Sequence, residues 1–207
     1  MPSAFTNPAQ TWDKRFAGPD YIFGTEPNAW LARHAHLLTP GTRALAVADG
    51  EGRNSVWLAR QGLQVDAFDI APLGVAKAEK LAQQHQVKVS YRVCGIDDWD
   101  WQNHSVDVVV AIFIQFADPD ARATLFANML DCLKPGGLLL LQGYTPRQLD
   151  YKTGGPPLLS HLYTEALLQS AFADADILEL DSYEDVLHEG SQHAGQSALV
   201  GMVARKR

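Results

Sequence analysis

Two patterns of hydrophobic and polar positions recur along the chain, one typical of strands and one typical of helices. Apolar runs and apolar-polar alternation predict seven strands, at 44–48, 63–69, 87–93, 105–114, 138–141, 175–187 and 197–205. Helical periodicity predicts helices near 12–16, 28–38, 72–86, 119–133 and 165–172, and another that begins near Val56 and stops at Gly62. Strands alternate with helices through the fifth strand, and two strands then follow close together. We therefore expect an α/β fold, a doubly wound, seven-stranded, mostly parallel sheet with a C-terminal antiparallel hairpin.

The first predicted strand ends at Asp49-Gly50-Glu51-Gly52, a turn that leads directly into a helix. Glycine adopts backbone angles closed to other residues, and it lets a ligand approach the main chain. A dinucleotide-binding turn places three glycines around a pyrophosphate, whereas here Ser55 replaces the third glycine. Asp49 and Glu51 would repel a pyrophosphate and attract a cation. The turn therefore predicts a ligand with positive charge, such as S-adenosylmethionine with its sulfonium and ammonium groups.

The stretch Asp49-Gly50-Glu51-Gly52-Arg53-Asn54 resembles motif I of the class I S-adenosylmethionine-dependent methyltransferases, and the order of elements is similar to that class through nearly the whole chain. Lys134-Pro135-Gly136-Gly137 also resembles the usual turn before the fifth strand. Within the class, short motifs look similar to the tellurite-resistance and thiopurine-methyltransferase-like branch: Trp12-Asp13-Lys14-Arg15-Phe16, Gly24-Thr25-Glu26-Pro27-Asn28, Gly143-Tyr144-Thr145-Pro146 and Thr153-Gly154-Gly155-Pro156.

This resemblance implies an enzyme that uses S-adenosyl-L-methionine as its cofactor and a single methyltransferase domain over residues 1–207. Residues 41–207 would form the Rossmann-like core. Residues 1–40 are rich in aromatic residues, glycine and proline, and they would either cap the sheet or close over the ligand as a lid. Both interpretations stay open, and they are compatible with each other.

Asp69 ends the second predicted strand, nineteen positions after Gly50. Similar folds place a carboxylate about twenty residues after the turn, where it binds ribose hydroxyls. Asp69 and Ile70 are therefore predicted to bind the ribose, and the alternative is a solvated strand-end acid or a helix cap. Ile96 and Asp97 are predicted to bind the adenine, through a backbone amide or through the Asp97 side chain. Residues 98–101 are alternatively a plain surface loop.

Ligands of such sheets lie beyond the carboxyl ends of the parallel strands. The motif I residues would bind the methionine part of the cofactor, residues 111–113 would form the pocket floor near the sulfonium, and N-terminal residues would close the pocket. Arg15 would bind a carboxylate or an anionic acceptor, or it is simply exposed. The predicted cofactor-binding residues are Trp12, Arg15, Phe16, Tyr21, Thr25, Asp49, Gly50, Glu51, Gly52, Arg53, Asn54, Asp69, Ile70, Ile96, Asp97, Ala111, Ile112 and Phe113.

The methyl acceptor is predicted from the residues after the fourth and fifth strands. Gln115 and Tyr144 are the catalytic candidates, and Gln115 stands where relatives of the branch carry a histidine, which leaves no obvious general base. Further polar groups in the predicted loops are Tyr151, His161 and His193. An acceptor that is already ionised needs no base, so a small, soft acceptor is expected, a thiol or a chalcogen oxyanion. A halide is equally compatible with the residues.

Other classes of function are less consistent with the sequence. A nicotinamide-dependent reductase would need an uncharged glycine turn, and a metal-dependent catechol-type methyltransferase would need a cluster of acids, so no metal site is predicted. A protein that binds S-adenosylmethionine without turnover, as a sensor or a partner switch, remains the alternative.

The composition narrows the set of partners. The chain of 207 residues has 17 basic and 24 acidic residues and a net charge of -7, without a basic run before 205–207, and this disfavours nucleic acid. Cys94 and Cys132 form no metal-type pair or disulfide framework, which favours a reducing compartment. No apolar run approaches the roughly twenty residues that span a bilayer. We expect a cytoplasmic protein without membrane partners, either a monomer or a homodimer.

Overall fold

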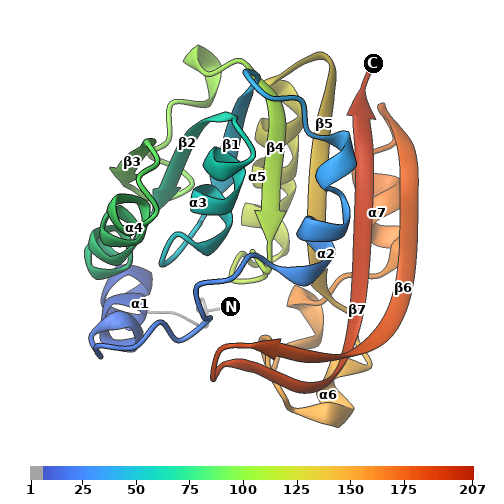
Figure 1. Cartoon of the computed structure of the whole chain (residues 1–207). Coiled ribbons are helices and arrows are strands. Elements are labelled where there is room, and N and C mark those ends of the chain that lie inside the picture. The colour runs from blue at the N-terminus through green and yellow to red at the C-terminus, as the bar shows by residue number, and fades with distance from the viewer. Residues whose placement is uncertain (1–6) are drawn as a thin grey trace. The chain divides into compact units, whose positions relative to one another are not determined.

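The computed structural model describes residues 7–207. These residues form two compact units that meet in the sequence between Trp99 and Asp100 (Figure 1). Each unit has its own strands, helices and buried residues. No helix within the described range is long and apolar enough to cross a membrane.

The first unit contains three parallel strands in the order β3-β2-β1. Its elements are α1 (Pro8–Phe16), α2 (Ala29–Arg33), η1 (Ala35–Leu37), β1 (Arg43–Val47), α3 (Arg53–Arg60), β2 (Gln64–Asp69), α4 (Pro72–Gln84) and β3 (Val89–Val93). The register pairs Val47 with Phe68 and Asp69 with Val93, so the carboxyl ends of the three strands lie side by side. This edge is where a ligand is expected in a parallel sheet.

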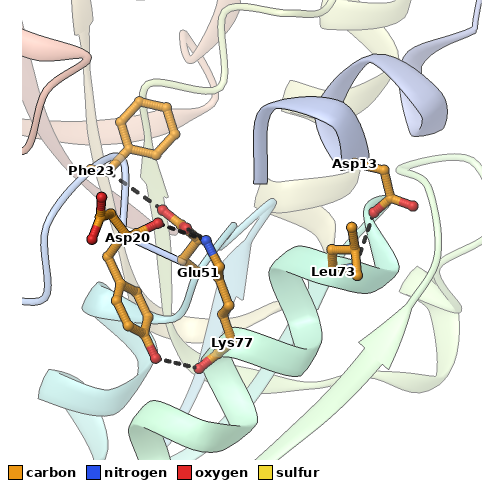
Figure 2. Close-up of polar contacts among 7 residues, drawn as sticks. Asp13, Asp20, Phe23, Glu51, Leu73 and Lys77 are labelled. Carbon is orange, nitrogen blue, oxygen red and sulfur yellow. Dashed lines mark hydrogen bonds and ion pairs between the residues drawn. The ribbon is translucent and has the colours of Figure 1, made fainter. Parts of the chain in front are cut away.

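Helix α4 is the main support of this edge. Pro72 occupies its first turn, where the missing N–H costs nothing. The helix has no cap from its own N-cap residue, Ala71, but the Leu73 N–H donates to the Asp13 carboxylate of α1 over 2.9 Å. Helix α1 therefore caps α4 from outside, and Figure 2 shows this contact.

The second unit contains four strands in the order β4-β5-β7-β6. Its elements are η2 (Trp101–Asn103), β4 (Val106–Ile112), α5 (Pro119–Asp131), β5 (Leu133–Tyr144), α6 (Gln148–Tyr151), η3 (Leu159–His161), α7 (Glu165–Ala171), β6 (Ala175–Glu189) and β7 (His193–Lys206). β4 and β5 are parallel, whereas β7 is antiparallel to both β5 and β6. The last two strands form the long curved hairpin visible in Figure 1.

The centre of the second unit is apolar on both faces of the sheet. Residues 108–111 of β4 and 139–141 of β5 are buried throughout, as expected for parallel strands covered on both sides. The side chain of Asp118 caps α5 by accepting the Ala121 N–H at 3.0 Å, and Pro119 begins the helix, so its predicted first position is confirmed. Lys134 forms an ion pair with Asp107 over 2.9 Å, which joins the start of β5 to β4.

The predicted fold class is confirmed, and Gly62, where the third helix is predicted to stop, has a left-handed backbone with φ +89°. Several local predictions are wrong. β5 begins at Leu133, so Lys134–Gly137 belong to the strand and do not form a turn before it. The helix predicted over 28–38 breaks at His34, whose Nδ1 bonds to the Trp30 carbonyl over 2.8 Å and ends the regular turn. Residues 143–157, where no helix is predicted, contain α6. β7 begins at His193, four positions before the predicted strand.

Candidate active site

The turn after β1 reverses the chain through three residues with positive φ, Ala48 (+49°), Gly50 (+62°) and Gly52 (+91°). Gly52 is required by close packing as well as by its backbone angle. A Cβ built on Gly52 would lie 2.6 Å from the Cβ of Ala78, and one built on Gly74 would lie 3.0 Å from the Gly50 carbonyl oxygen. The turn therefore packs directly on the small residues of α4. Ala48 was not predicted to need this geometry, because alanine gives no signal for it.

Asp49 organises the turn through Ser55. Its carboxylate accepts the Ser55 N–H at 3.2 Å and also accepts the Ser55 hydroxyl, so it caps the first turn of α3. The Ser55 hydroxyl in turn lies 2.9 Å from the Tyr91 hydroxyl of β3. Burial raises the pKa of Asp49 to about 7, although the hydrogen bonds from Ser55 oppose this shift. The side chain predicted to contact the cofactor thus has a structural task as well.

Glu51 is paired inside the protein. Figure 2 shows its carboxylate between Lys77 and Phe23: Lys77 Nζ lies 2.8 Å from Oε1, and the Phe23 N–H donates to Oε2 over 3.4 Å. The Glu51 side chain is only 1% exposed. The expectation that Glu51 offers an uncompensated negative charge to a ligand is therefore wrong, because Lys77 neutralises it.

Lys77 also fixes the segment 20–28, called the N-terminal segment from here on. Its Nζ donates to the Asp20 carbonyl over 2.7 Å, and the Tyr21 hydroxyl donates to the Lys77 carbonyl over 3.0 Å. Predicted site residue Tyr21 thus binds α4 through its hydroxyl. Together with the ion pair to Glu51, these contacts join α4, the turn and the N-terminal segment at one point.

Arg53 and Asn54 bind the same segment. Arg53 Nη1 donates to the Phe23 carbonyl over 3.2 Å, and the Asn28 N–H donates to Asn54 Oδ1 over 3.0 Å. Asn28 then caps α2 by accepting the Leu31 N–H at 2.9 Å. The side chains of Glu51, Arg53 and Asn54 therefore hold the N-terminal segment on the turn.

An aromatic cluster covers the turn from the side of α1. Phe16 is 2% exposed, its ring stacks on Trp12 at 5.7 Å, and it meets Phe23 edge-on at 6.2 Å. The Phe16 ring also lies 3.5 Å from the position of a Cβ on Gly50. Arg15 lies over the Trp12 ring at 4.5 Å, a cation–π contact. Phe16 thus contacts the turn and Tyr21 contacts α4, whereas Trp12 and Arg15 pack within the aromatic cluster. Arg15 and Thr25 are exposed.

Asp69 connects the turn to the end of β2. Its Oδ2 accepts the Gly50 N–H and its Oδ1 accepts the Ala71 N–H, each at 2.9 Å. Burial raises the pKa of Asp69 to about 6. Each carboxylate oxygen has a second lone pair, so both can still accept a hydroxyl. Asp69 therefore accepts a hydrogen bond just before α4, close to the predicted helix-cap alternative, and ribose binding at the same residue stays a prediction.

The end of β3 adds the third part of this edge. The Cys94 N–H donates to the Asp69 carbonyl over 3.0 Å, which brings Gly95 next to β2. A Cβ on Gly95 would meet Ile70 Cδ1 at 3.6 Å and Asp98 Oδ2 at 3.5 Å. The carboxylate beside Gly95 thus belongs to Asp98, while the side chain of predicted residue Asp97 is exposed and Ile96 is half-buried.

The loop that begins at Asp98 is not a plain surface loop in the first unit. Trp99 is buried and its ring stacks on Phe68 at 4.7 Å, with 18° between the ring planes. Arg92 lies over the same ring at 5.6 Å. The aromatic residue anchors the chain against β2, and this holds Gly95 and Asp98 at the strand ends.

In the second unit, predicted floor residues 111–113 end β4. Ala111 is buried, Ile112 and Phe113 are half-buried, and Phe113 has a φ of +56°. The Phe113 ring stacks on Tyr144 at 4.7 Å and meets His193 edge-on at 4.3 Å. Gly155 lies so close to the Tyr144 ring that a Cβ built on Gly155 would be 2.7 Å from Cδ2 of Tyr144. This explains the paired glycines after α6, which the sequence alone left without a task.

Gln115, predicted to be catalytic, is committed to the backbone. Its Oε1 accepts the Tyr144 N–H at 2.6 Å, and its Nε2 donates to the Tyr144 carbonyl at 2.9 Å and to the His161 carbonyl at 3.1 Å. Both amide hydrogens are therefore used. Gln115 positions Tyr144 and His161 and offers no hydrogen to a substrate, so its prediction as a reacting group is corrected. We call Phe113, Gln115, Tyr144 and His161 the β4–β5 edge.

Sequence reasoning missed Lys77, Gly74 and Ala78, which share one face of α4. A signal existed in their spacing, since residues three and four apart lie on the same side of a helix and two small residues permit close approach. The sequence around Phe23 gives no comparable signal for its two backbone contacts, the N–H with Glu51 and the carbonyl with Arg53. Within residues 7–207, no group of three His, Cys, Asp or Glu side chains could hold a metal ion.

Comparison with known protein families finds a match: the family model described as a methyltransferase domain matches residues 44–137. Ubiquinone biosynthesis O-methyltransferase from Xanthomonas campestris pv. campestris (strain B100) is 38% identical over 108 residues, 52% of this chain and 45% of that protein. The chain thus spans less than half the length of the curated relatives it matches.

Solved structures share the fold over almost the whole chain. N-methyltransferase NodS from Bradyrhizobium japonicum WM9, in complex with S-adenosyl-l-homocysteine, has a TM-score of 0.73 at 15% identity and covers 97% of this chain and 98% of its own. TehB from Haemophilus influenzae has a TM-score of 0.70 at 18% identity, and the match covers 96% of this chain and 67% of the TehB chain. Likeness at this identity shows the Rossmann-like α/β fold with a mixed seven-stranded sheet. Residues 44–137 thus match a methyltransferase domain, which supports the predicted enzyme class and its cofactor, S-adenosylmethionine.

Proposed function

We propose that the chain transfers the methyl group of S-adenosyl-L-methionine to a small, soft acceptor, a thiol or a chalcogen oxyanion. The observation that carries the proposal is the hydrogen bond from the Gly50 N–H to Asp69. It joins the glycine turn after β1 to the acid after β2, the two elements that would bind the methionine part and the ribose. The matched domain model spans both elements.

The residues present fit the donor. Both Asp69 oxygens retain lone pairs for the ribose hydroxyls, Gly95 lies beside Ile70 where the adenine would bind, and half-buried Gly50 is the residue of the turn that would meet the methionine part. The bound donor supplies an electrophilic methyl group on a sulfonium. The chain supplies orientation and the exclusion of water, which together contribute several kcal/mol to such a transfer.

The soft acceptor rests on two features. Short motifs of this chain look similar to the tellurite-resistance and thiopurine-methyltransferase-like branch, including Thr153-Gly154-Gly155-Pro156 against the Tyr144 ring. Gln115 also offers no reacting group, and an acceptor that is already ionised needs no general base from the protein. The named activity of the Xanthomonas relative, O-methyl transfer in ubiquinone biosynthesis, supplies the competing acceptor class, a hydroxyl.

Turnover with a methyl-labelled donor tests this proposal. The acceptors are alkyl and aryl thiols, selenite, tellurite and a catechol, and an Asp69→Ala variant is the control for donor binding. Label in a thioether or in a methylated chalcogen is the expected result. Label in the catechol alone would replace the soft acceptor by a hydroxyl. Tight donor binding without transfer to any acceptor would favour a sensor.

A further inference from the structure

Helix α4 begins directly after the predicted ribose site, and its own N-cap residue cannot cap it. The N-cap position is Ala71, two residues after Asp69, and alanine has no side-chain atom that accepts a hydrogen bond. The first N–H groups of a helix have no acceptor within the helix, so a helix start without other acceptors frays. At the start of α4, two carboxylates from other elements of the first unit accept these groups.

The two carboxylates belong to Asp69 and Asp13. The Ala71 N–H donates to Asp69 Oδ1, and the next N–H along the chain, that of Leu73, donates to Asp13 Oδ1 of α1, each over 2.9 Å. The other carboxylate oxygen of Asp69 accepts the Gly50 N–H. Helix α1, the start of α4, the end of β2 and the turn are therefore connected by hydrogen bonds, and Asp13 contributes the outermost of them.

Phe16 fixes α1 at this place. A Cβ built on Gly74 would lie 3.0 Å from Phe16 Cδ2, and one built on Gly50 would lie 3.5 Å from Phe16 Cζ. The buried ring thus lies between the turn and the first turn of α4. Asp13 precedes Phe16 by three positions, and residues three apart share one face of a helix. The packing of Phe16 therefore brings the Asp13 carboxylate to the Leu73 N–H.

The Asp13 carboxylate also acts on Asp69 through its charge. Burial raises the pKa of Asp69 to about 6, backbone hydrogen bonds oppose the rise, and the negative charge of Asp13 adds to it. Charged and titratable groups on the elements around the turn and the end of β2 further include Asp49, Glu51, Arg53, Lys77, Cys94 and Asp98. Asp13 is thus linked to Asp69 both by hydrogen bonds and by electrostatics.

We propose that Asp13 is a positioning residue of the donor site, the turn after β1 together with Asp69, and that it acts on the donor through Asp69. It fixes the start of α4, so the chain from Asp69 to Leu73 is ordered before the donor arrives, and binding does not have to order it. This inference rests on the proposed function and deepens it: α1 contributes to donor affinity through α4 rather than by contact of Asp13 with the donor.

Calorimetric titration with S-adenosylhomocysteine tests this inference without any acceptor. Asp13→Ala removes the acceptor of the Leu73 N–H and should weaken binding about five- to tenfold, the equivalent of one lost helix cap. Asp13→Asn keeps an oxygen in the same place and should restore the affinity at pH 8. Asp20→Ala is the charge-matched control, because it removes an exposed acid after α1 and keeps the carbonyl that binds Lys77. It should bind as wild type does.

Asp13→Asn also gives a result that a merely structural cap would not produce. The rise of affinity with pH reports the ionisation of Asp69, and removing the negative charge of Asp13 favours the ionised form. The midpoint of the rise should therefore shift to lower pH in Asp13→Asn and stay unchanged in Asp20→Ala. Since asparagine retains the cap, this measurement does not depend on whether Asp13→Ala folds.

Wild-type affinity in Asp13→Ala, or an unshifted midpoint in Asp13→Asn, would overturn the role of Asp13. Additive losses of affinity in the double variant Asp13→Ala/Asp69→Ala would overturn it too, because a residue that acts through Asp69 should have little effect once Asp69 is removed. In all three cases the wild-type protein still binds S-adenosylhomocysteine, and the proposed function stands. A wild-type protein that does not bind it would contradict the donor site, and with it both proposals.

Discussion

The turn after β1 and the β4–β5 edge both follow parallel strands, yet their polar side chains bind different parts of the chain. In the turn, Glu51 and its neighbours bind α4 and the N-terminal segment. At the edge, the side chain of Gln115 binds the backbone of Tyr144 and His161. The first region thus holds a distant segment in place, whereas the second fixes the ends of β5 and η3.

This difference shows that the charge of a motif cannot be read from its own residues. Asp49 and Glu51 suggest two negative charges when the turn is considered alone. Lys77 compensates Glu51, and burial raises the pKa of Asp49 to about 7, so the turn is far less negative than its sequence suggests. The preference for a donor without phosphate therefore rests on geometry and on the matched domain model.

The largest expected effect follows from the tight packing of the turn. Gly52→Ala should destabilise the protein by about 4 kcal/mol, because a left-handed alanine costs 1–2 kcal/mol and the overlap with Ala78 costs a similar amount or more. Gly41→Ala is the matched control, since Gly41 has a φ of +88° but nothing within 4 Å of its Cβ position, and it should lose only about 1 kcal/mol. Urea unfolding measures both, and equal losses would mean that α4 does not press on the turn.

The ion pair under the N-terminal segment comes next. Lys77→Met should cost about 3 kcal/mol of unfolding free energy, because it leaves the Glu51 carboxylate buried without its partner. Glu51→Gln likewise removes the carboxylate partner of the Lys77 ammonium. The double variant should lose clearly less than the sum of the two single losses. Additive losses would show that the two side chains act independently.

Asp69→Ala is expected to weaken binding of S-adenosylhomocysteine by about 1.5–3 kcal/mol, the usual cost of lost hydrogen bonds to a charged group. Asp66→Ala is the matched control, since this acid belongs to the same strand but pairs with Arg43. Calorimetric titration compares the two variants with wild type. Unchanged affinity in Asp69→Ala would mean that Asp69, the last residue of β2, does not bind the ribose.

Binding should also depend on pH through Asp69. Its pKa of about 6 in the free protein means that the carboxyl is protonated below that value, while hydroxyl donors favour the ionised form. Affinity should therefore rise with pH between about 5 and about 7 and then level off. Asp69→Asn should flatten this rise, and a profile that Asp69→Asn leaves unchanged would assign the titration to another group.

The smallest expected effect concerns a buried hydroxyl of the second unit. The Tyr163 hydroxyl is fully buried, has no hydrogen-bond partner among the described residues, and burial raises its pKa. Tyr163→Phe should therefore stabilise the protein by up to about 1 kcal/mol. Tyr21→Phe, which removes the hydrogen bond to Lys77, should destabilise it by a similar amount. A loss of stability in Tyr163→Phe would indicate that the hydroxyl is satisfied.

The sequence predicted the strands well where burial on both faces makes them continuously apolar, as in β4, and it predicted helix ends where capping chemistry is local, as at Asp118 and Gly62. It failed for β7, because the long hairpin continues past the core with polar residues on β6. α6 was missed because four residues are too few to show a helical period.

The candidate site was predictable where spacing carries the information. Asp69 follows from its distance to Gly50 along the chain, and the structure joins the two by a hydrogen bond. The partner of Glu51 lies 26 positions away, and no local pattern connects the two. The task of Gln115 was equally hidden, because its partners at 144 and 161 meet it only in the folded chain.

We propose that the turn after β1 and Asp69 bind S-adenosylmethionine. The decisive experiment is calorimetric titration of the purified protein with S-adenosylmethionine and S-adenosylhomocysteine, with NAD and NADP as controls. We expect one binding event with each adenosyl compound and none with either dinucleotide. Binding of a dinucleotide, or of none of the four, would contradict the assignment of the turn and of the site built on it.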